Sequence, residues 1–298
     1  DDLIGTGPTL QCGFKNDAWN RQIEMLWNEW CAEIGFVGKL KTAKLAKTID
    51  GEGPLIFKTA NDLEHPVKLY PVDVEADQVT NPMPADPNQW MVDGIDYDPS
   101  TNRVKSYSVL KYHPGDFWFP DMHPMAVERI PARNMVMWIQ KFRPGQMRGL
   151  PAFTSSLDLF SEMRSFRKST LEAAQTAANH SAVVETEAPP GADEGDTDAE
   201  NYEFRRVQIN RNMMTVLPHR WKMNQFRAEH PGSTYEMFIE LGLREAIRPL
   251  SYPLLAALGT SQKFNFSSSK LDHINYRNGL NVERADANVR VLRPTFAE

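Results

Sequence analysis

Residues 142–151, FRPGQMRGLP, join two segments of different character. They follow an apolar run at 134–141, NMVMWIQK, that is typical of a β-strand, and they precede a stretch at 154–180 without glycine or proline, which is typical of a long helix. The Pro-Gly pair at 144–145 predicts a tight turn, and Gly149 predicts a conformation that a side chain would forbid. Because the stretch holds no nucleophile, metal-ligand cluster or phosphate-binding loop, we expect it to be a structural junction.

The composition is that of an ordinary globular protein. The chain has 298 residues, 41% of them hydrophobic, and a net charge of −6, which allows one to three domains and disfavours tight DNA binding. Cys12 and Cys31 form no Cys-x-x-Cys pair and predict buried thiols in a reducing compartment. No apolar run approaches the ~18 residues of a membrane span. The start is not a signal peptide, and because it lacks Met we expect it to lie inside a longer product.

The residues before the junction predict a mixed α and β region. Apolar residues at helical spacing predict a helix over 16–34, capped by Asn16 or Asp17, with its three tryptophans in the core. A second helix is expected over 37–48. Short strands are expected at 54–60, 67–74, 89–98, 103–112 and 134–141, with a hairpin turn around 98–102.

The residues after the junction predict long helices around a small β excursion. Arg164, Arg167 and Lys168 form a basic stripe on the first helix, 154–180, at spacings of three and four residues. The same helix has an apolar stripe, near which lie Leu157, Phe160, Met163 (or Arg164) and Leu171. A second helix begins at a capping box, Ser233–Glu236, and ends near Pro249 and Pro253. Two long helices that bracket an excursion indicate a stalk whose neighbours come from other subunits.

The excursion between these helices is acidic. Seven acids and no basic residue occur between residues 185 and 200, in a stretch that also holds Pro-Pro-Gly and several small polar residues. This composition predicts an exposed loop flanked by strand-like segments.

Four ordered stretches carry a resemblance that no single one would support. They are IGTGPTLQ (4–11), DGIDYDPSTNRVKSYSVLKYHPGD (93–116), RIPARNMVMWIQKFRPGQMRGLPAF (129–153) and FNFSSSKLDHINYRNG (264–279). Their order and spacing resemble those of the portal proteins of tailed bacteriophages, in particular of the phage lambda type.

The resemblance implies an α+β portal fold with a mixed α/β wing and two long stem helices that bracket a small β-containing clip. The implied segments are the wing at 1–148, the first stem helix at 149–180, the clip at 181–230, the second stem helix at 231–258, the tunnel loop at 259–269, and the start of a truncated crown helix at 270–298.

The resemblance also implies a function and partners. Such a subunit forms a ring of twelve copies at the capsid vertex of the virion, assembles in the host cytoplasm, and conducts DNA during packaging and ejection. The implied partners are the terminase large subunit, capsid and scaffolding proteins, a tail-adaptor protein, and double-stranded DNA held weakly and without sequence preference. No membrane, cofactor, metal or enzymatic activity is implied.

Three groups of site residues follow from the resemblance. The motor-docking group of the clip is Asp193, Glu194, Asp196, Asp198 and Glu200. The wing–stem junction is Arg143, Gly145, Gln146, Arg148 and Gly149, whose arginines are expected to pair with acids of the same or the adjacent subunit, the alternative being a turn with two solvated arginines. The DNA-channel group is Ser261, Gln262, Lys263, Asn265 and Ser267, with Arg244 and Arg248 on the second stem helix.

Two more of these assignments have open alternatives. Arg244 and Arg248, one helical turn apart, are equally compatible with salt bridges between subunits. In the tunnel loop, Phe264 and Phe266 are expected to alternate with polar residues and anchor the loop, whereas the alternative is an ordinary helix–helix connector.

Two further functions were weighed. A metal-dependent nuclease would use one of two clusters, either Asp73, Glu75 and Asp77 or His113, Asp116, Asp121 and His123. A solvated strand face and surface turns are the favoured interpretation of both. A related head–tail adaptor ring is the third reading. ATP hydrolysis by this chain is not expected, because it lacks the G-x-x-x-x-G-K-[ST] phosphate loop.

Overall fold

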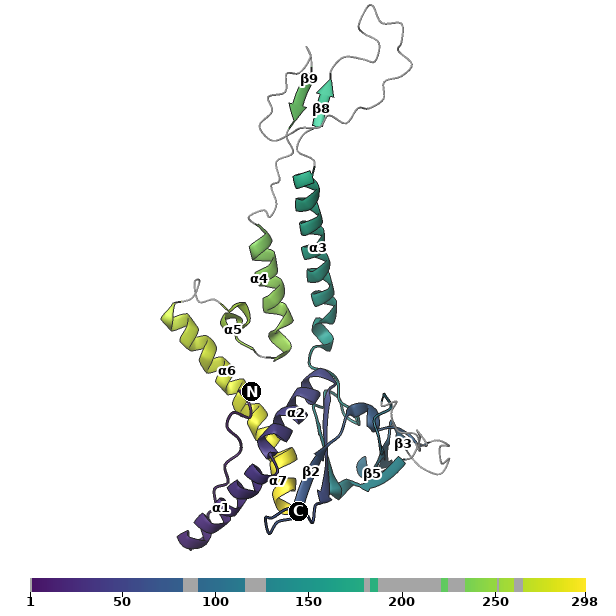
Figure 1. Cartoon of the computed structure of the whole chain (residues 1–298), viewed down its shortest axis with the longest axis vertical. Helices are drawn as coiled ribbons and strands as arrows, with labels where there is room; N and C mark the ends of the chain where they lie inside the picture. Colours follow the sequence, from purple (N-terminus) through teal and green to yellow (C-terminus); the bar gives the residue numbers. More distant parts are fainter. Residues whose placement is uncertain are drawn as a thin grey trace, which may run out of the picture. The chain divides into compact units, whose positions relative to one another are not determined.

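The computed structural model describes residues 2–82, 91–115, 127–179, 183–186, 221–224, 234–250, 252–259 and 265–298. It divides into two compact units, one formed by Asp1–Leu157 with Leu243–Glu298 and the other by Asp158–Gly242. The described residues form helices and small antiparallel sheets, which confirms a mixed α+β composition (Figure 1).

Two antiparallel sheets form the framework of the first unit. In the three-stranded sheet, the central strand β1 (Glu52–Thr59) pairs with β2 (Leu69–Asp73) and with β7 (Met135–Ile139). The four-stranded sheet has the order β3 (Met91–Val92), β4 (Ile95–Asp98), β5 (Arg103–Leu110) and β6 (Val127–Pro131).

The second sheet differs from the sequence prediction in two places. The expected strand 89–98 is two strands, because Asp93 and Gly94 both adopt positive φ and turn the chain between β3 and β4. Strand β6 was not predicted. The hairpin turn near 98–102 is confirmed, with Asn102 at φ +54°.

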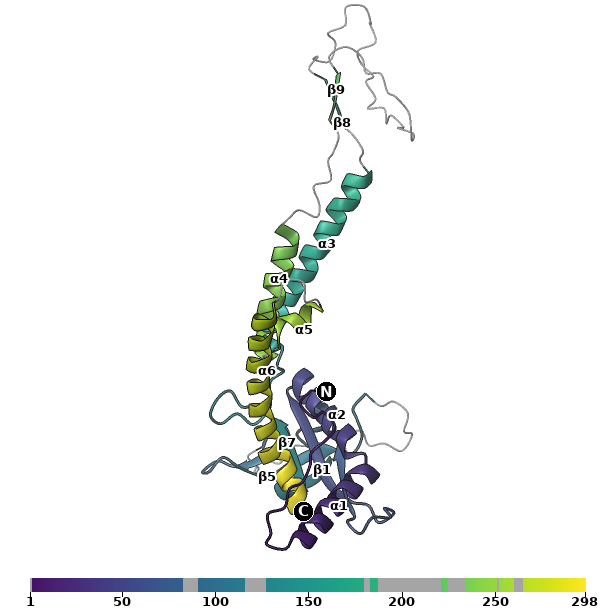
Figure 2. The same ribbon diagram turned by 90° about the vertical axis from the view of Figure 1, so that its left-hand side faces the viewer.

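Strand alternation in the three-stranded sheet produces two cores. Leu55 and Trp138, both fully buried, face a core formed with helices α1 (Asp17–Glu33) and α2 (Phe36–Ile49). Ile56 and Met135, one residue out of phase, face a second core shared with the four-stranded sheet. The unit is therefore layered as helices, sheet and sheet, and both views show α2 alongside β1 (Figures 1 and 2).

Helix α1 is capped as predicted but is only partly core. The Asn16 side chain accepts hydrogen bonds from the backbone N–H groups of Ala18 (3.0 Å) and Trp19 (3.4 Å). Trp30 is buried, and Trp27 packs against the same core. Trp19 is 63% exposed, so the prediction that all three tryptophans lie in the core is wrong for this one.

The two cysteines are free thiols, as expected. Cys31 is buried in the helical core, and burial raises the pKa of its thiol to about 12. Cys12 is only half-buried, so the prediction of a buried thiol holds for Cys31 alone.

The C-terminal helices complete the first unit. Helix α6 (Phe266–Ala287) continues through a π-helical turn (Asn288–Leu292) into α7 (Arg293–Ala297). Val291 is fully buried in the helical core, and the π-helical turn contacts β7 (Figure 2).

Asp286 of α6 is the polar anchor of this contact. It accepts hydrogen bonds from Trp138 Nε1 (3.2 Å), Lys47 Nζ (3.4 Å) and Arg290 Nε (2.5 Å). Burial acts to raise the pKa of Asp286, but the bonds and charges of Arg290 and Lys47 outweigh it, so the pKa lies below its ordinary value.

The second unit contains two antiparallel helices. In both views α3 (Leu157–Asn179) runs beside α4 (Thr234–Ala246), and β8 (Val183–Thr186) pairs with β9 (Trp221–Asn224) (Figures 1 and 2). The helices pack closely at Gly242, where a Cβ atom would lie 2.7 Å from Met163 Sδ. The Phe166 ring adds contacts to Phe238 at 4.4 Å and Tyr235 at 5.7 Å between ring centroids.

Helix α4 ends at Ala246, near the predicted prolines. A 3-10 turn (Arg248–Leu250) and the short helix α5 (Leu254–Leu258) follow it. Of the residues in the expected apolar stripe of α3, Met163 is buried, whereas Leu157 and Leu171 are 58% and 59% exposed.

Replacing Asp286 with Asn is expected to lower the free energy of unfolding by about 1–3 kcal/mol at pH 7, because it leaves buried Lys47 with a neutral partner. The pKa of Asp286 is depressed in the fold, so this stabilisation is present above the unfolded value of about 3.9 and is lost as pH falls through the folded pKa. Glu283→Gln, which breaks the more exposed pair with Lys44, is the control and is expected to cost under about 1 kcal/mol. Urea titrations that give equal losses of unfolding free energy for the two variants would contradict the role of Asp286 as the polar anchor.

Candidate functional site

The junction 142–151 is organised by one buried amide. Gly145 has φ +72°, as a tight turn after Pro144 requires. The Gln146 side chain is 5% exposed, and its Oε1 accepts from the backbone N–H groups of Phe142 (2.7 Å) and Arg143 (3.3 Å). Its Nε2 donates to the Arg148 carbonyl at 2.8 Å. One side chain thus satisfies backbone groups on both sides of the turn.

Gly149 is required for a reason other than the predicted one. Its φ is not positive, but a Cβ atom there would lie 1.9 Å from the Gly51 carbonyl oxygen. Gly51 has φ +89°, and a Cβ on it would lie 2.5 Å from the Leu150 carbonyl carbon. Two glycines therefore let the junction backbone cross directly over the start of β1.

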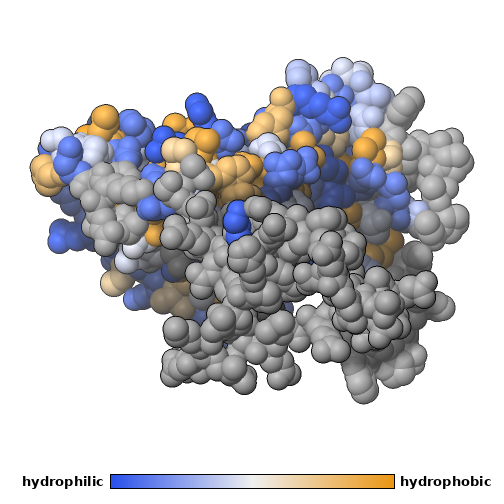
Figure 3. Space-filling view, turned by 90° about the horizontal axis from the view of Figure 1, so that it is seen from above, coloured by the Kyte–Doolittle hydropathy of each residue, from blue (hydrophilic) through white to orange (hydrophobic). Residues whose placement is uncertain are grey.

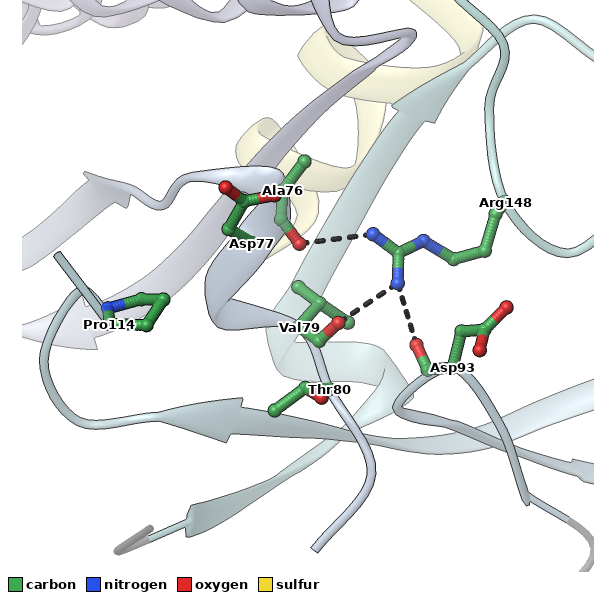
Figure 4. Close-up of a pocket in the computed structure, with 7 residues that line it drawn as sticks. All are labelled: Ala76, Asp77, Val79, Thr80, Asp93, Pro114 and Arg148. Carbon is green, nitrogen blue, oxygen red and sulfur yellow. Dashed lines mark hydrogen bonds between the residues drawn. The ribbon is translucent and has the colours of Figure 1, made fainter. Parts of the chain in front are cut away.

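Arg148 connects the junction to three other parts of the first unit. Its Nε donates to Glu52 Oε1 at 2.6 Å, at the start of β1. The terminal nitrogens donate to the carbonyls of Asp93 (2.7 Å), Val79 (2.9 Å) and Ala76 (3.0 Å), as Figure 4 shows. Four of the five guanidinium donors are used, which leaves little capacity for a ligand.

Glu52 is the buried partner of this ion pair. It is 2% exposed, and its Oε1 also accepts from the Gly149 N–H at 2.6 Å. Its Oε2 has no hydrogen-bond partner among the residues that the structure describes. Burial first, and then the charge of Glu52, raise the pKa of nearby Tyr107 to about 12. A buried carboxylate of this kind needs a fixed cation, and Arg148 supplies it.

An open hollow of about 400 Å³ lies beside the guanidinium (Figure 4). It is lined by Ala76, Asp77, Val79, Thr80, Asp93, Pro114 and Arg148. Because the guanidinium is directed at protein carbonyls, the arrangement clamps backbone segments together.

Comparison with known protein families identifies the family of this chain. The family described as phage portal protein, lambda family, matches residues 1–284. The chain belongs to the lambda family of phage portal proteins. A search of curated proteins gave no match. The match supports portal function, and membership implies an oligomeric ring at the capsid vertex of the virion. The nuclease alternative gains no support from it.

The family of portal proteins is structural rather than enzymatic. Glu75 pairs with His113, its Oε2 lying 2.9 Å from Nε2. In the described ranges no group of three or more His, Cys, Asp or Glu residues can hold a metal ion. Asp116, Asp121 and His123 lie outside those ranges. Where the structure describes helices, none is long and apolar enough to cross a membrane.

The remaining expected site residues of the portal protein are only partly described. The clip acids Asp193–Glu200 lie outside the described residues, as do Ser233 of the expected capping box and the loop residues at 261–264. Arg244 belongs to α4, and Arg248 begins the 3-10 turn that follows it.

The expected extended conformation of the tunnel loop is wrong from Asn265 onward. Asn265 caps α6, its Oδ1 accepting from the Ser268 N–H at 2.8 Å, and Ser267 lies in the first helical turn. Phe266 is 83% exposed rather than anchored. The Asn-x-x-Ser spacing forms a reciprocal cap, a signal that the search for strand-like alternation overlooked.

Glu52 was missed from sequence, although a signal was present. A lone acid at the start of the apolar strand EGPLIF predicts a buried carboxylate, which requires a cation from elsewhere in the chain.

Arg148→Lys is expected to lower the free energy of unfolding by about 2–4 kcal/mol, because an ammonium cannot replace the four bonds of the guanidinium fork. Arg143 is exposed in the same turn, so Arg143→Lys is the matched control and is expected to change stability by less than about 0.5 kcal/mol. Chemical denaturation of both variants tests this, and similar stabilities for the two would show that the clamp is dispensable.

Proposed function

We propose that this portal protein forms a twelve-subunit ring that nucleates capsid assembly, conducts DNA during packaging and ejection, docks the terminase large subunit and later receives a tail-adaptor protein. Capsid and scaffolding proteins would contact the same ring, first in the host cytoplasm. The observation that carries the proposal is the family match over residues 1–284.

The charge of the chain suits a DNA conduit. Each phosphate that a Lys or Arg neutralises adds affinity through counterion release, which would hinder sliding. A net charge of −6 per subunit, with few cations at the channel, keeps DNA contact weak and independent of sequence.

The assembled state tests the proposal directly. Light scattering should give about twelve times the 33.9 kDa of the chain, and particle images should show a ring with a central hole. A monomer at every concentration would contradict it. Incubation with DNA and Mg²⁺ or Mn²⁺ should give no cleavage, whereas metal-dependent cleavage would revive the nuclease alternative.

The acidic loop Asp193–Glu200 is proposed as the clip surface that docks the motor. Seven acids without a cation between residues 185 and 200 create a field that steers a basic partner and weakens with salt. Replacing Asp193, Asp196 and Asp198 with Asn should weaken motor binding at least tenfold at low salt without changing the unfolding temperature. Unchanged affinity would contradict the docking role.

The segment 259–265, which lies between α5 and α6, is proposed as the tunnel loop, with Lys263 as its cation toward the channel. One cation per subunit gives a weak, salt-screened contact that is compatible with sliding. Lys263→Ala should leave the ring intact and reduce DNA retention, with Lys270→Ala, an exposed position on α6, as the control. Equal retention by the two variants would favour the ordinary-connector alternative.

A further inference from the structure

The stretch IGTGPTLQ, at 4–11, belongs to an irregular segment that crosses three helices. This segment, residues 2–14, is called the strap below; it forms turns at 2–6 and no helix or strand after them. In both views the strap starts beside α6, and Figure 1 shows it running to the start of α1 (Figures 1 and 2). Its contacts with these helices indicate its role.

Helix α6 holds the first residues of the strap. Arg284 donates from Nε to the Leu3 carbonyl at 3.0 Å and from Nη2 to the Asp2 carbonyl at 2.8 Å. Tyr276 Oη, two turns earlier on α6, donates to Asp2 Oδ2 at 2.8 Å. Burial first, and then the bond to Asp2, raise the pKa of the Tyr276 hydroxyl, so it remains a donor at neutral pH.

Gly7 brings the strap directly onto α2. Its φ is +116°, and a Cβ atom there would lie 2.6 Å from Val37 Cγ2. Both the backbone conformation and the close approach therefore require glycine at this position. Gly7 thus fixes the path along which the strap passes from α6 to α1.

Helix α1 holds the far end of the strap. Trp27 Nε1 donates to the Pro8 carbonyl at 3.4 Å, and Glu24 Oε1 accepts from the Cys12 backbone N–H at 2.8 Å. These bonds, like those of Arg284, join helix side chains to the strap backbone. Because they belong to no helix or β-ladder, the strap can detach while the helices and sheets stay folded.

The strap is held by few contacts for its length. Leu3 is buried in the helical core, and the other strap residues are half-buried or exposed. Ordering an extended segment costs backbone entropy at every residue, and here one buried leucine and a handful of hydrogen bonds offset that cost. A segment with this balance opens more readily than the core that it lies on.

The first half of α6 depends on equally specific contacts. No residue from 266 to 279 is buried. Hydrophobic and hydrophilic residues are mixed along it, as they are among the coloured atoms of the surface seen from above (Figure 3). Within this half, Tyr276 contacts both Asp2 of the strap and the ring of Tyr252, 5.5 Å away, in the segment that precedes α5. The strap is therefore placed to fix this half of α6.

We propose that the strap is a conformational latch that engages and releases as one unit. When engaged, it ties α6 to α1 and fixes the first half of α6; when released, it frees that half while the core stays folded. The segment 259–265, proposed as the tunnel loop, ends where α6 begins. In the portal the latch would therefore set the position of that end of the loop, a consequence that rests on the proposed function.

The two cysteines report the state of the latch in the full chain. Cys12 lies in the strap, whereas Cys31 is buried in the core, where its raised pKa keeps the thiol unreactive. Arg284→Ala removes contacts at the opposite end of the strap from Cys12. Because the strap detaches as a unit, a maleimide should label Cys12 at least about fivefold faster in this variant, while Cys31 stays slow. Arg277→Ala, at an exposed position of the same helix, is the control and should leave both rates unchanged.

Gly7→Ala tests the effect of the latch on α6. It disturbs the strap at α2, so amide hydrogen exchange at 266–279 should become at least about threefold faster. Gly38→Ala is the matched control, because it lies next to Val37 and its Cβ would meet nothing within 4 Å.

Four results would overturn the latch. They are unchanged Cys12 labelling in Arg284→Ala, unchanged exchange of α6 in Gly7→Ala, equal changes in the control variants, and labelling of Cys31 in step with Cys12, which would indicate unfolding of the whole unit.

The consequence for the portal is tested separately. Rings of Gly7→Ala should retain packaged DNA less well than rings of Gly38→Ala, and equal retention would overturn the effect of the latch on the tunnel loop. A wild-type chain that forms no ring would instead contradict the proposed function, whereas thiol labelling and hydrogen exchange would still decide the latch.

Discussion

The ion pair between Arg148 and Glu52 is the interaction on which the first unit depends. Burying a carboxylate until it is 2% exposed is unfavourable without a fixed partner, and the guanidinium provides one at 2.6 Å. The same guanidinium holds the carbonyls of Ala76, Val79 and Asp93. Removing one member of a buried ion pair destabilises a fold strongly, because the other charge is left without a partner. We therefore expect loss of Arg148 to release three segments at once: the start of β1, the segment that precedes β3, and the β3–β4 turn.

Backbone contact reinforces this clamp. Gly51 and Gly149 let the junction cross β1 at a distance that no side chain allows, and the Gly149 N–H bonds to Glu52. The chain therefore leaves the three-stranded sheet along a defined path. For a portal subunit this matters, since the copies in an oligomeric ring have to present equivalent surfaces to one another.

Local sequence patterns predicted the helices and their ends well wherever one rule, such as helical spacing, an N-cap or a proline, is sufficient. Helical spacing gave α1, α2, α3 and α4, the asparagine cap gave the start of α1, and the prolines gave the end of α4. Strand β6 was missed because its five residues, VERIP, include two adjacent charged residues and a proline. The Asp93–Gly94 turn was missed because it lies inside an otherwise strand-like run. The Arg148–Glu52 pair joins residues 96 apart, a separation at which no local pattern operates.

The candidate site was only partly predictable, for a related physical reason. The sequence identified three residues of the junction as a group, namely Gln146, Arg148 and Gly149. The role of Gly149 depends on its close contact with Gly51, and no sequence pattern links these two glycines. Loop residues at 261–264 and the clip acids lie outside the described residues, so their roles stay predictions.

The apolar stripe of α3 shows most clearly what a helical period leaves open. The period identified Leu157, Phe160 and Leu171 as apolar positions on one side of the helix, but it does not specify which body covers them. Within the hairpin, the face that α4 covers is set by Met163 and Phe166 instead. A helical period therefore identifies which residues share a side of α3, while tertiary packing decides which of those sides is covered.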